Sequence, residues 1–438
     1  MQAPRPFQII LYFGFGLLMA AALVLIVNPP SGGGTTVQRT GPVTIWGTID
    51  RSVMDTRINE FRSRESRSVF ESVRYRQIRE EDFNTEVVSA IAERRQPDLI
   101  IIPHRLLMEH RSIIQPIAYT NPGYSRRELR DAYLDGFEIF EHSNGLYAIP
   151  LAVDPLVMYW NRDIFANNGF SQPPQTWEEV VNNIVPTIVR RTVDRRITMS
   201  PVALGVYDNN RNAFAFLSTL LLQGGSQLIT EDRGQLAIQL NTARPGGQPN
   251  PMVAAVNFFT RFADPGDTLY SWNRTKQLDR QEFLAEDLAI YFGLGSEYPE
   301  LRRQNPNLNF DIARVPQSAD ATIQRTYGDF YGIAILQAAP NRNGAQQVAG
   351  ALGTLSVTRT LAQSLNFAPP HRASIGAGSQ APAEQVVFSS ALVARGWLNP
   401  RWQRTDDIFR QLIADVQAGR INAANGVRDT LSRLRQAF

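Results

Sequence analysis

The sequence of 438 residues contains no cysteine, a single lysine and only four histidines. The absence of cysteine excludes disulfide bonds, thiolate metal sites, cysteine nucleophiles and lipid attachment through sulfur. Four histidines, His104, His110, His142 and His371, leave little material for a histidine-based metal site or catalytic triad. We therefore expect no metal ion and no cofactor.

A strong excess of either charge is also missing. The chain has 44 basic and 41 acidic residues, a formal net charge of +3, and no long basic run. Proteins that bind nucleic acid usually carry a basic patch or stripe, so nucleic acid is not an expected partner. Lys276 is the only lysine, and we interpret the preference for arginine mainly as genomic base composition.

Motifs of several common enzyme classes are absent. There is no phosphate loop ending in Gly-Lys-Ser/Thr, no HExxH, no GxSxG and no EF-hand loop. A carboxylate pair such as Asp50 and Asp154 is the type of pair that hydrolyses glycosides, but among 41 acidic residues a chance pair carries little weight. The sequence predicts a protein that is not an enzyme.

The composition is that of a folded chain, with 43% hydrophobic and 19% charged residues. Its length suggests two or three domains, or one large protein with a deep cleft.

The N-terminus carries an uncharged apolar run of 21 residues, Phe7 to Val27. A helix of about 20 residues spans the hydrocarbon core of a bilayer. Arg5 precedes the run and the next charge is Arg39, so the positive-inside rule places the bulk of the chain outside the cytoplasm. A cleaved signal peptide is the alternative, but Asn28-Pro29-Pro30 is a poor end for its cleavage site. We predict residues 1–27 to be a cytoplasmic stub and single-pass anchor in the cell membrane.

Residues 28–41 are rich in Pro, Gly, Ser and Thr and predict a flexible stalk.

The folded body then begins with an expected β-α-β-α-β pattern, with strands over 43–48, 69–76 and 98–102 and helices over 52–64 and 82–94. This pattern favours a parallel sheet, with ligands bound beyond the carboxyl ends of its strands. Residues 46–50 and 103–105 are therefore expected near a cleft.

Further along the chain, strands are expected over 146–150, 155–159, 287–292, 310–314 and 331–335. Helices are expected over 213–222, 250–262, 280–285, 345–365, 406–417 and 425–437. Thr176 and Glu179 have the spacing of a capping box, which predicts a helix that starts there.

Four segments together resemble bacterial extracellular solute-binding proteins of the maltose-binding-protein type. The most specific is LYAIPLAVDPLVMYWNRDIFANNGFSQPPQTWEEV, residues 146–180; the others are EDLAIYFGLGSEY (286–298), residues 43–61 with Trp46, and YGDFYGIAI (327–335). Unlike the lipoprotein members of the family, this chain has no acceptor cysteine, and it lacks the clear cleavage site of secreted members.

The resemblance implies an α/β, two-lobe periplasmic-binding-protein type II fold with discontinuous lobes and a hinge. We expect residues 42–152 with 293–330 in the first lobe and residues 153–292 with 331–438 in the second. The chain is expected to cross between the lobes near residues 151–154, 291–295 and 330–332.

A sugar site needs polar groups at the rim of the sugar and aromatic rings over its faces. The predicted strand ends and crossings supply nine candidate ligand-binding residues: Trp46, Asp50, Asp154, Tyr159, Trp272, Glu297, Tyr298, Asp329 and Tyr331. Several have structural alternatives. Trp46 and Tyr159 would equally suit a core, Asp50 would suit a helix N-cap, and we favour core packing for Trp177 and a C-terminal clamp for Trp397 and Trp402.

The resemblance implies a monomeric, membrane-anchored receptor that binds a carbohydrate or similar polar solute by lobe closure and delivers it to an ABC permease. Two alternatives stay open from the sequence. One is a surface scaffold or adhesion protein that has kept the fold, and the other is a receptor for a peptide or another polar solute.

Overall fold

The computed structural model describes residues 40–63, 67–226, 229–232, 235–238 and 250–437. The predicted anchor and all but the last two residues of the predicted stalk lie outside these ranges. Within the described ranges, no helix is both long enough and apolar enough to cross a membrane.

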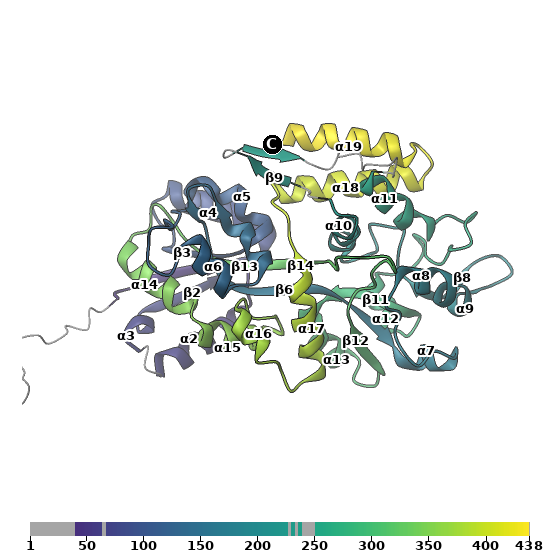
Figure 1. Ribbon diagram of the computed structural model, residues 1–438, viewed down its shortest axis with the longest axis horizontal. Helices are drawn as coiled ribbons and strands as arrows, with labels where there is room; N and C mark the ends of the chain where they lie inside the picture. The colour runs from purple at the N-terminus through teal and green to yellow at the C-terminus, as the bar shows by residue number, and fades with distance from the viewer. Residues whose placement is uncertain (1–39, 64–66, 227–228, 233–234, 239–249, 438) are drawn as a thin grey trace, which may run out of the picture.

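The described chain forms two α/β lobes joined by one ten-stranded sheet, and Figure 1 shows the lobes side by side with β6 passing through both. The sheet runs in the order β2 (Val73–Gln77), β1 (Val43–Gly47), β3 (Leu99–Pro103), β13 (Thr326–Ile335), β6 (Ile149–Asn161), β11 (Leu288–Leu294), β8 (Ile197–Val202) and β7 (Arg190–Arg191). In addition, β12 (Phe310–Ala313) pairs with β6, and β14 (Ala394–Arg395) pairs with β13.

The first lobe contains the predicted parallel unit, since β1 pairs in parallel with both β2 and β3. Its helices are α2 (Arg51–Ser63), α3 (Arg67–Phe70), α4 (Glu80–Ala92), α5 (Leu107–His110), α6 (Arg126–Ala132), α14 (Arg342–Leu352), α15 (Leu355–Leu365) and α16 (Arg372–Gly376). The helix expected over 345–365 is thus two helices that meet near Gly353. A Cβ at Gly353 would lie 2.5 Å from Ile149, so the chain turns where it touches β6.

The second lobe surrounds the other half of the sheet. Its helices are α7 (Arg162–Asn167), α8 (Trp177–Glu179), α9 (Val185–Ile188), α10 (Ala213–Gln223), α11 (Pro251–Arg261), α12 (Asp279–Leu284), α13 (Tyr298–Gln304), α18 (Trp402–Gln417) and α19 (Ala423–Ala437). The capping box predicted at Thr176 is confirmed. The Thr176 side chain accepts a hydrogen bond from the Glu179 backbone N–H, and the Glu179 side chain accepts one from the Thr176 backbone N–H.

Strand β6 connects the lobes without a break, where the sequence suggested two strands flanking a crossing. Its residues 149–155 pair with β13, and its residues 156–161 pair with β11 and β12. Side chains alternate between two cores, with Val153 and Val157 on one face and Leu156 and Met158 on the other. All 13 residues are buried, and the strand continues through Pro155 without interruption.

The strand pairings differ from the predicted lobe boundaries. Residues 331–335 were expected in the second lobe, but they pair with β3 of the first. Residues 310–313 were expected in the first lobe, but they pair with the second-lobe half of β6. The strands concerned are buried, so their apolar pattern does not record which neighbour they pair with.

Helix α17 (Pro382–Val393) packs beneath the junction, against β6, β12 and β13.

Candidate functional site

A polar cavity of about 550 Å³ lies between the lobes, and we call it the interlobe cleft. The first lobe contributes Arg105, just after β3, and the start of β13; the second contributes the residues before α10, the turn after β11, and α18. The lining residues are Arg105, Tyr207, Asp208, Asn210, Arg211, Asn212, Ala213, Phe214, Ala215, Leu294, Ser296, Glu297, Tyr327, Asp329, Trp402, Asp406 and Arg410.

One wall is formed by residues 205–212, the cleft loop. Gly205 has a φ of +101°, and a Cβ there would lie 2.6 Å from Ala263, so only glycine suits this position. The Asn210 amide donates to the Ala203 carbonyl at 2.7 Å and accepts from the Asn212 N–H at 3.1 Å. These local bonds give a strongly polar sequence one defined conformation.

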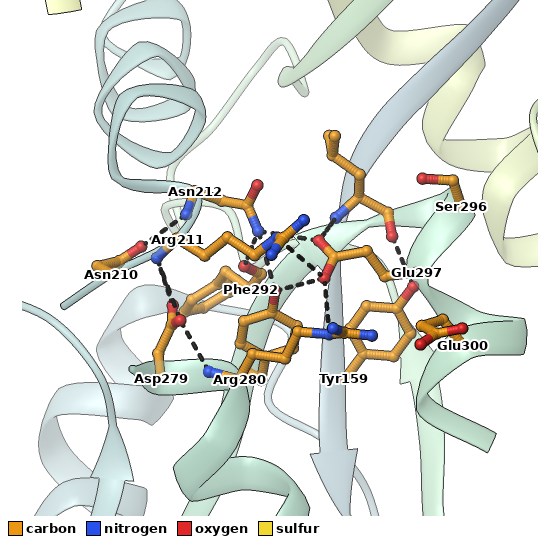
Figure 2. A network of polar contacts seen from close by, with 12 residues as sticks. Tyr159, Asn210, Arg211, Asn212, Asp279, Arg280, Phe292, Ser296, Glu297 and Glu300 are labelled. Carbon is orange, nitrogen blue, oxygen red and sulfur yellow. Dashed lines mark hydrogen bonds and ion pairs between the residues drawn. The ribbon is translucent and has the colours of Figure 1, made fainter. Parts of the chain in front are cut away.

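Glu297 is the centre of the polar network drawn in Figure 2, where Arg211, Arg280 and Asn212 point toward its carboxylate. That carboxylate accepts hydrogen bonds from the Asn212 amide at 3.0 Å, the Tyr291 hydroxyl at 2.6 Å and the Leu294 N–H at 3.0 Å. The guanidinium of Arg280 lies 3.3 Å away and that of Arg211 lies 3.8 Å away. Glu297 therefore connects the turn after β11 to the cleft loop.

Asp279 supports the cleft loop from behind. Its buried carboxylate accepts from the Arg211 N–H at 3.1 Å and from the Arg280 N–H at 2.8 Å. Burial raises the pKa of Asp279 from 3.8 to about 7, against the lowering effect of those two N–H donors, and the Glu297 charge adds to the rise.

The raised pKa of Asp279 predicts a pH-dependent contribution to stability. The folded state keeps this proton between pH 3.8 and about 7, whereas the unfolded state loses it, so this contribution is lost as pH rises through that window. We expect Asp279→Asn to remove it, which makes the difference in Tm between variant and wild type shift in favour of the variant from pH 5 to pH 8. Thermal unfolding at both pH values measures this difference, and a constant difference would contradict the assignment.

On the first-lobe side, Arg105 forms a buried charge cluster. Its guanidinium pairs with the Asp329 carboxylate and bonds to Glu80, with a 2.8 Å contact from Nε. Burial opposes the charged form, but the two carboxylates outweigh it and raise the pKa of Arg105. Asp329 also accepts from the Tyr327 hydroxyl at 2.8 Å. Burial and the charge of Arg105 lower the pKa of the adjacent His104 to about 3, so this ring is neutral.

Trp402, the first residue of α18, supplies an aromatic surface. Its ring stands perpendicular to Phe214 at 4.6 Å and lies 5.3 Å from the Arg105 guanidinium. Its backbone N–H donates to the Glu109 carboxylate of α5 at 2.8 Å. Helix α18 is thereby attached to the first lobe at the cleft.

Two of the predicted site residues, Glu297 and Asp329, line the interlobe cleft. Asp154 lies directly behind it, because its buried carboxylate accepts from the N–H of Ser296, which does line the cleft. Burial raises the pKa of Asp154 well above its usual range. The structure therefore gathers three predicted residues at one junction: Asp154 of β6, Asp329 of β13 and Glu297 of the turn after β11.

The other predicted residues lie away from the cleft lining. Trp46 faces α4 in a small pocket, and Asp50 is exposed and accepts from the Ser52 N–H as a helix cap. Tyr159 and Trp272 are fully buried. Tyr298 packs against Phe310, and Tyr331 stacks on Phe367 at 5.1 Å. The structural alternatives named for two of these residues, core packing for Trp46 and a helix N-cap for Asp50, match their surroundings.

Sequence reasoning missed most of the second-lobe wall. The polar run DNNRN (208–212) has no apolar pattern, and its importance follows only from its place before α10. Two signals were present in part: Arg105 was expected near a cleft, and Trp402 was noted but interpreted as a clamp. It does pack on Phe214, and it also lines the cleft.

A larger groove of about 1050 Å³ lies at the opposite end of α10, lined by residues from 135–141, 222–226, 318–325 and 395–398 and by Ile229. We assign the solute site to the smaller cleft, because it lies beyond the carboxyl ends of β3 and β11, where Arg105 and Glu297 line it. In the described part of the chain, no group of three or more His, Asp or Glu side chains is placed to hold a metal ion.

Comparisons with known proteins agree with this architecture. A sequence model of the family of bacterial extracellular solute-binding proteins matches residues 72–384. A protein of Brucella abortus (strain 2308) that is named only as a binding protein is 20% identical over 333 residues, which cover 74% of this chain and 75% of the relative.

Solved structures show the same fold at low sequence identity. A cyclic α-maltosyl-1,6-maltose binding protein of Arthrobacter globiformis has a TM-score of 0.71 at 16% identity, covering 91% of this chain and 99% of that one. UgpB of Mycobacterium tuberculosis, in complex with glycerophosphocholine, has a TM-score of 0.70 at 16% identity, covering 91% and 98%. A cyclo/maltodextrin-binding protein with bound maltotetraose has a TM-score of 0.70 at 14% identity, covering 90% and 96%. The two-lobe fold inferred from the sequence is confirmed.

Proposed function

The chain belongs to the family of bacterial extracellular solute-binding proteins, which are receptors rather than enzymes, and we propose that it binds a neutral carbohydrate or similar polyhydroxylated solute in the interlobe cleft. Solute contact with both lobes would favour a closed arrangement about the β6 junction. The receptor would then deliver its solute to an ABC permease.

The chemistry of the cleft supports a neutral, hydroxyl-rich solute. Its lining contains four carboxylates, Asp208, Glu297, Asp329 and Asp406, and three guanidiniums, Arg105, Arg211 and Arg410, with Arg280 beside Glu297. Since the opposite charges pair with one another, the cleft has little net charge to select an ion. Paired planar groups bind vicinal hydroxyls, and Trp402 provides a surface for the C–H face of a sugar.

The solved structures of similar fold support the same solute class. Two of the three described above are binding proteins for maltose-type sugars, and the third was solved with glycerophosphocholine, which carries a hydroxylated glycerol unit. These proteins share the fold with this chain at low identity, so the proposed solute class rests first on the chemistry of the cleft.

The proposal includes membrane attachment through residues 7–27, supported by the 21-residue uncharged run and by the positive charge before it. A tether of this kind raises the concentration of the receptor near a permease in the same membrane. The folded body would lie on the extracytoplasmic side.

A thermal-shift screen tests the proposal. The chain is screened against maltotetraose, other mono- and oligosaccharides, glycerophosphodiesters, amino acids and short peptides. We expect a saturable rise in Tm with one class of neutral polyhydroxylated solute, because a ligand that binds only the folded state stabilises it. Membrane attachment is tested separately by sedimentation. The full chain should sediment with membranes, whereas a chain starting at residue 40 should not. A shift with peptides or amino acids alone, or with no solute, would contradict the proposal.

A further inference from the structure

The cleft loop rests on a second loop, residues 269–282, which we call the brace loop. Trp272 of the brace loop is fully buried, and its indole Nε1–H donates to the Asn209 side-chain oxygen at 2.7 Å. The Asn209 amide nitrogen in turn donates to the carbonyls of Asn273 at 2.9 Å and Lys276 at 3.1 Å. Both ends of the Asn209 side chain are therefore held by the brace loop.

Lys276, the single lysine of the chain, lies in this loop. Its Nζ is 2.6 Å from the Glu282 carboxylate, and the two side chains are only 10% and 9% exposed. Glu282 also accepts from the Gln277 N–H at 2.8 Å, so the ion pair closes the brace loop onto α12. The ammonium lies 6.0 Å from the centre of the Trp272 ring.

The identity of residue 276 has a physical reason here. A lysine ammonium is a compact point charge on an unbranched stem, whereas the guanidinium of arginine is broad, planar and needs several acceptors. The buried site beside Trp272 offers one carboxylate. Apart from residue 276, every position that could carry lysine or arginine as its basic residue carries arginine. The lysine at 276 therefore indicates a constraint that base composition does not explain.

The contacts continue from the brace loop into the cleft. The Asp279 N–H donates to the Asn209 carbonyl at 2.9 Å, and the Asp279 carboxylate accepts from the Arg211 N–H. The next residues, Asn210, Arg211 and Asn212, line the cleft, and Asn212 bonds to Glu297. A displacement of Asn209 would therefore move the polar groups of the second-lobe wall.

We infer that Trp272 and Lys276 are positioning residues for solute recognition, which act through Asn209 and contact no solute themselves. This inference rests on the proposed function. It replaces the expected role of Trp272 as a stacking platform, because a side chain without exposed surface offers none to a sugar.

A matched pair of tryptophan variants tests the inference in the full chain, purified in detergent. Trp272→Phe keeps the packing of the ring and removes the bond to Asn209. Trp177→Phe does the same for a 2.7 Å bond from Trp177 to Gln223 in the same lobe, outside the cleft. We expect Trp272→Phe to weaken binding of maltotetraose, or of the panel solute with the largest thermal shift, about tenfold, and Trp177→Phe to leave it unchanged.

The single lysine provides an independent readout. Isotope-labelled lysine gives one side-chain NMR signal, and we expect solute titration to shift it along the same saturation curve as calorimetry. The shift should be lost in Trp272→Phe and kept in Trp177→Phe. Two results would overturn the inference: equal affinities of both variants for the solute, or a lysine signal that does not shift when solute binds. In either case, solute binding by the wild type would leave the proposed function supported. Failure of the wild type to bind any panel solute would instead overturn the proposed function, and the inference with it.

Discussion

Replacing Arg105 with methionine is expected to lower the free energy of unfolding by about 3–5 kcal/mol, because removing one partner leaves buried charge without compensation. Asp329 has only 7% of its side chain exposed, and without Arg105 it keeps one side-chain hydrogen bond, from the Tyr327 hydroxyl. Equilibrium unfolding in urea measures the loss.

Arg79→Met is the matched control. Arg79 also pairs with two carboxylates, Glu81 and Asp82, but its side chain is 74% exposed, so its loss should cost far less stability than the loss of Arg105. The double variant Arg105→Met with Asp329→Asn should recover part of the stability, because it removes the unpaired charge as well. If Arg105→Met costs no more than Arg79→Met, the buried cluster does not stabilise the junction of the lobes.

Local sequence patterns were sufficient for many individual helices and strands, whereas the two-lobe arrangement was inferred from the family resemblance. The alternation of short apolar runs and helical spacing located β1, α2, α4 and β3, and the spacing of Thr176 and Glu179 identified a capping box that the structure contains. Such features depend on residues a few positions apart. The lobe assignment of β12 and β13 depends on which strand each one pairs with. The apolar pattern of such a strand does not identify its pairing partner.

The cleft was predictable only in part for a related reason. Glu297 and Asp329, which line the cleft, could be proposed because they follow or lie in apolar strands, β11 and β13, that the sequence pattern predicts. Trp272 was misplaced because an aromatic residue in a polar loop suggests exposure, whereas the loop folds back and buries it against Asn209. Whether a tryptophan faces a solute or a neighbouring loop is decided by tertiary contacts, which a single sequence does not contain.

Glu297 offers the most direct test of the cleft. Glu297→Ala is expected to weaken solute binding by at least about 100-fold, which corresponds to roughly 3 kcal/mol. It removes the acceptor for Asn212, Tyr291 and Leu294 at once and leaves Arg280, whose side chain is 15% exposed, without its partner. The direct bond between Glu297 and the cleft loop would then be lost, and Asn212 would keep only its bonds to the Tyr291 hydroxyl at 3.1 Å and the Phe292 carbonyl at 3.2 Å. Calorimetric titration with the solute found in the thermal-shift screen measures the loss.

Two further variants separate charge from geometry. Glu297→Gln keeps an oxygen that can accept from the Leu294 N–H but loses the charge facing Arg280, so its loss of affinity should fall between wild type and Glu297→Ala. Glu300→Ala is the control: this glutamate lies one turn further on and pairs with Arg303 outside the cleft. Its removal should leave affinity unchanged. Equal losses for Glu300→Ala and Glu297→Ala would show that the α13 turn as a whole, and not the carboxylate at its start, organises the site.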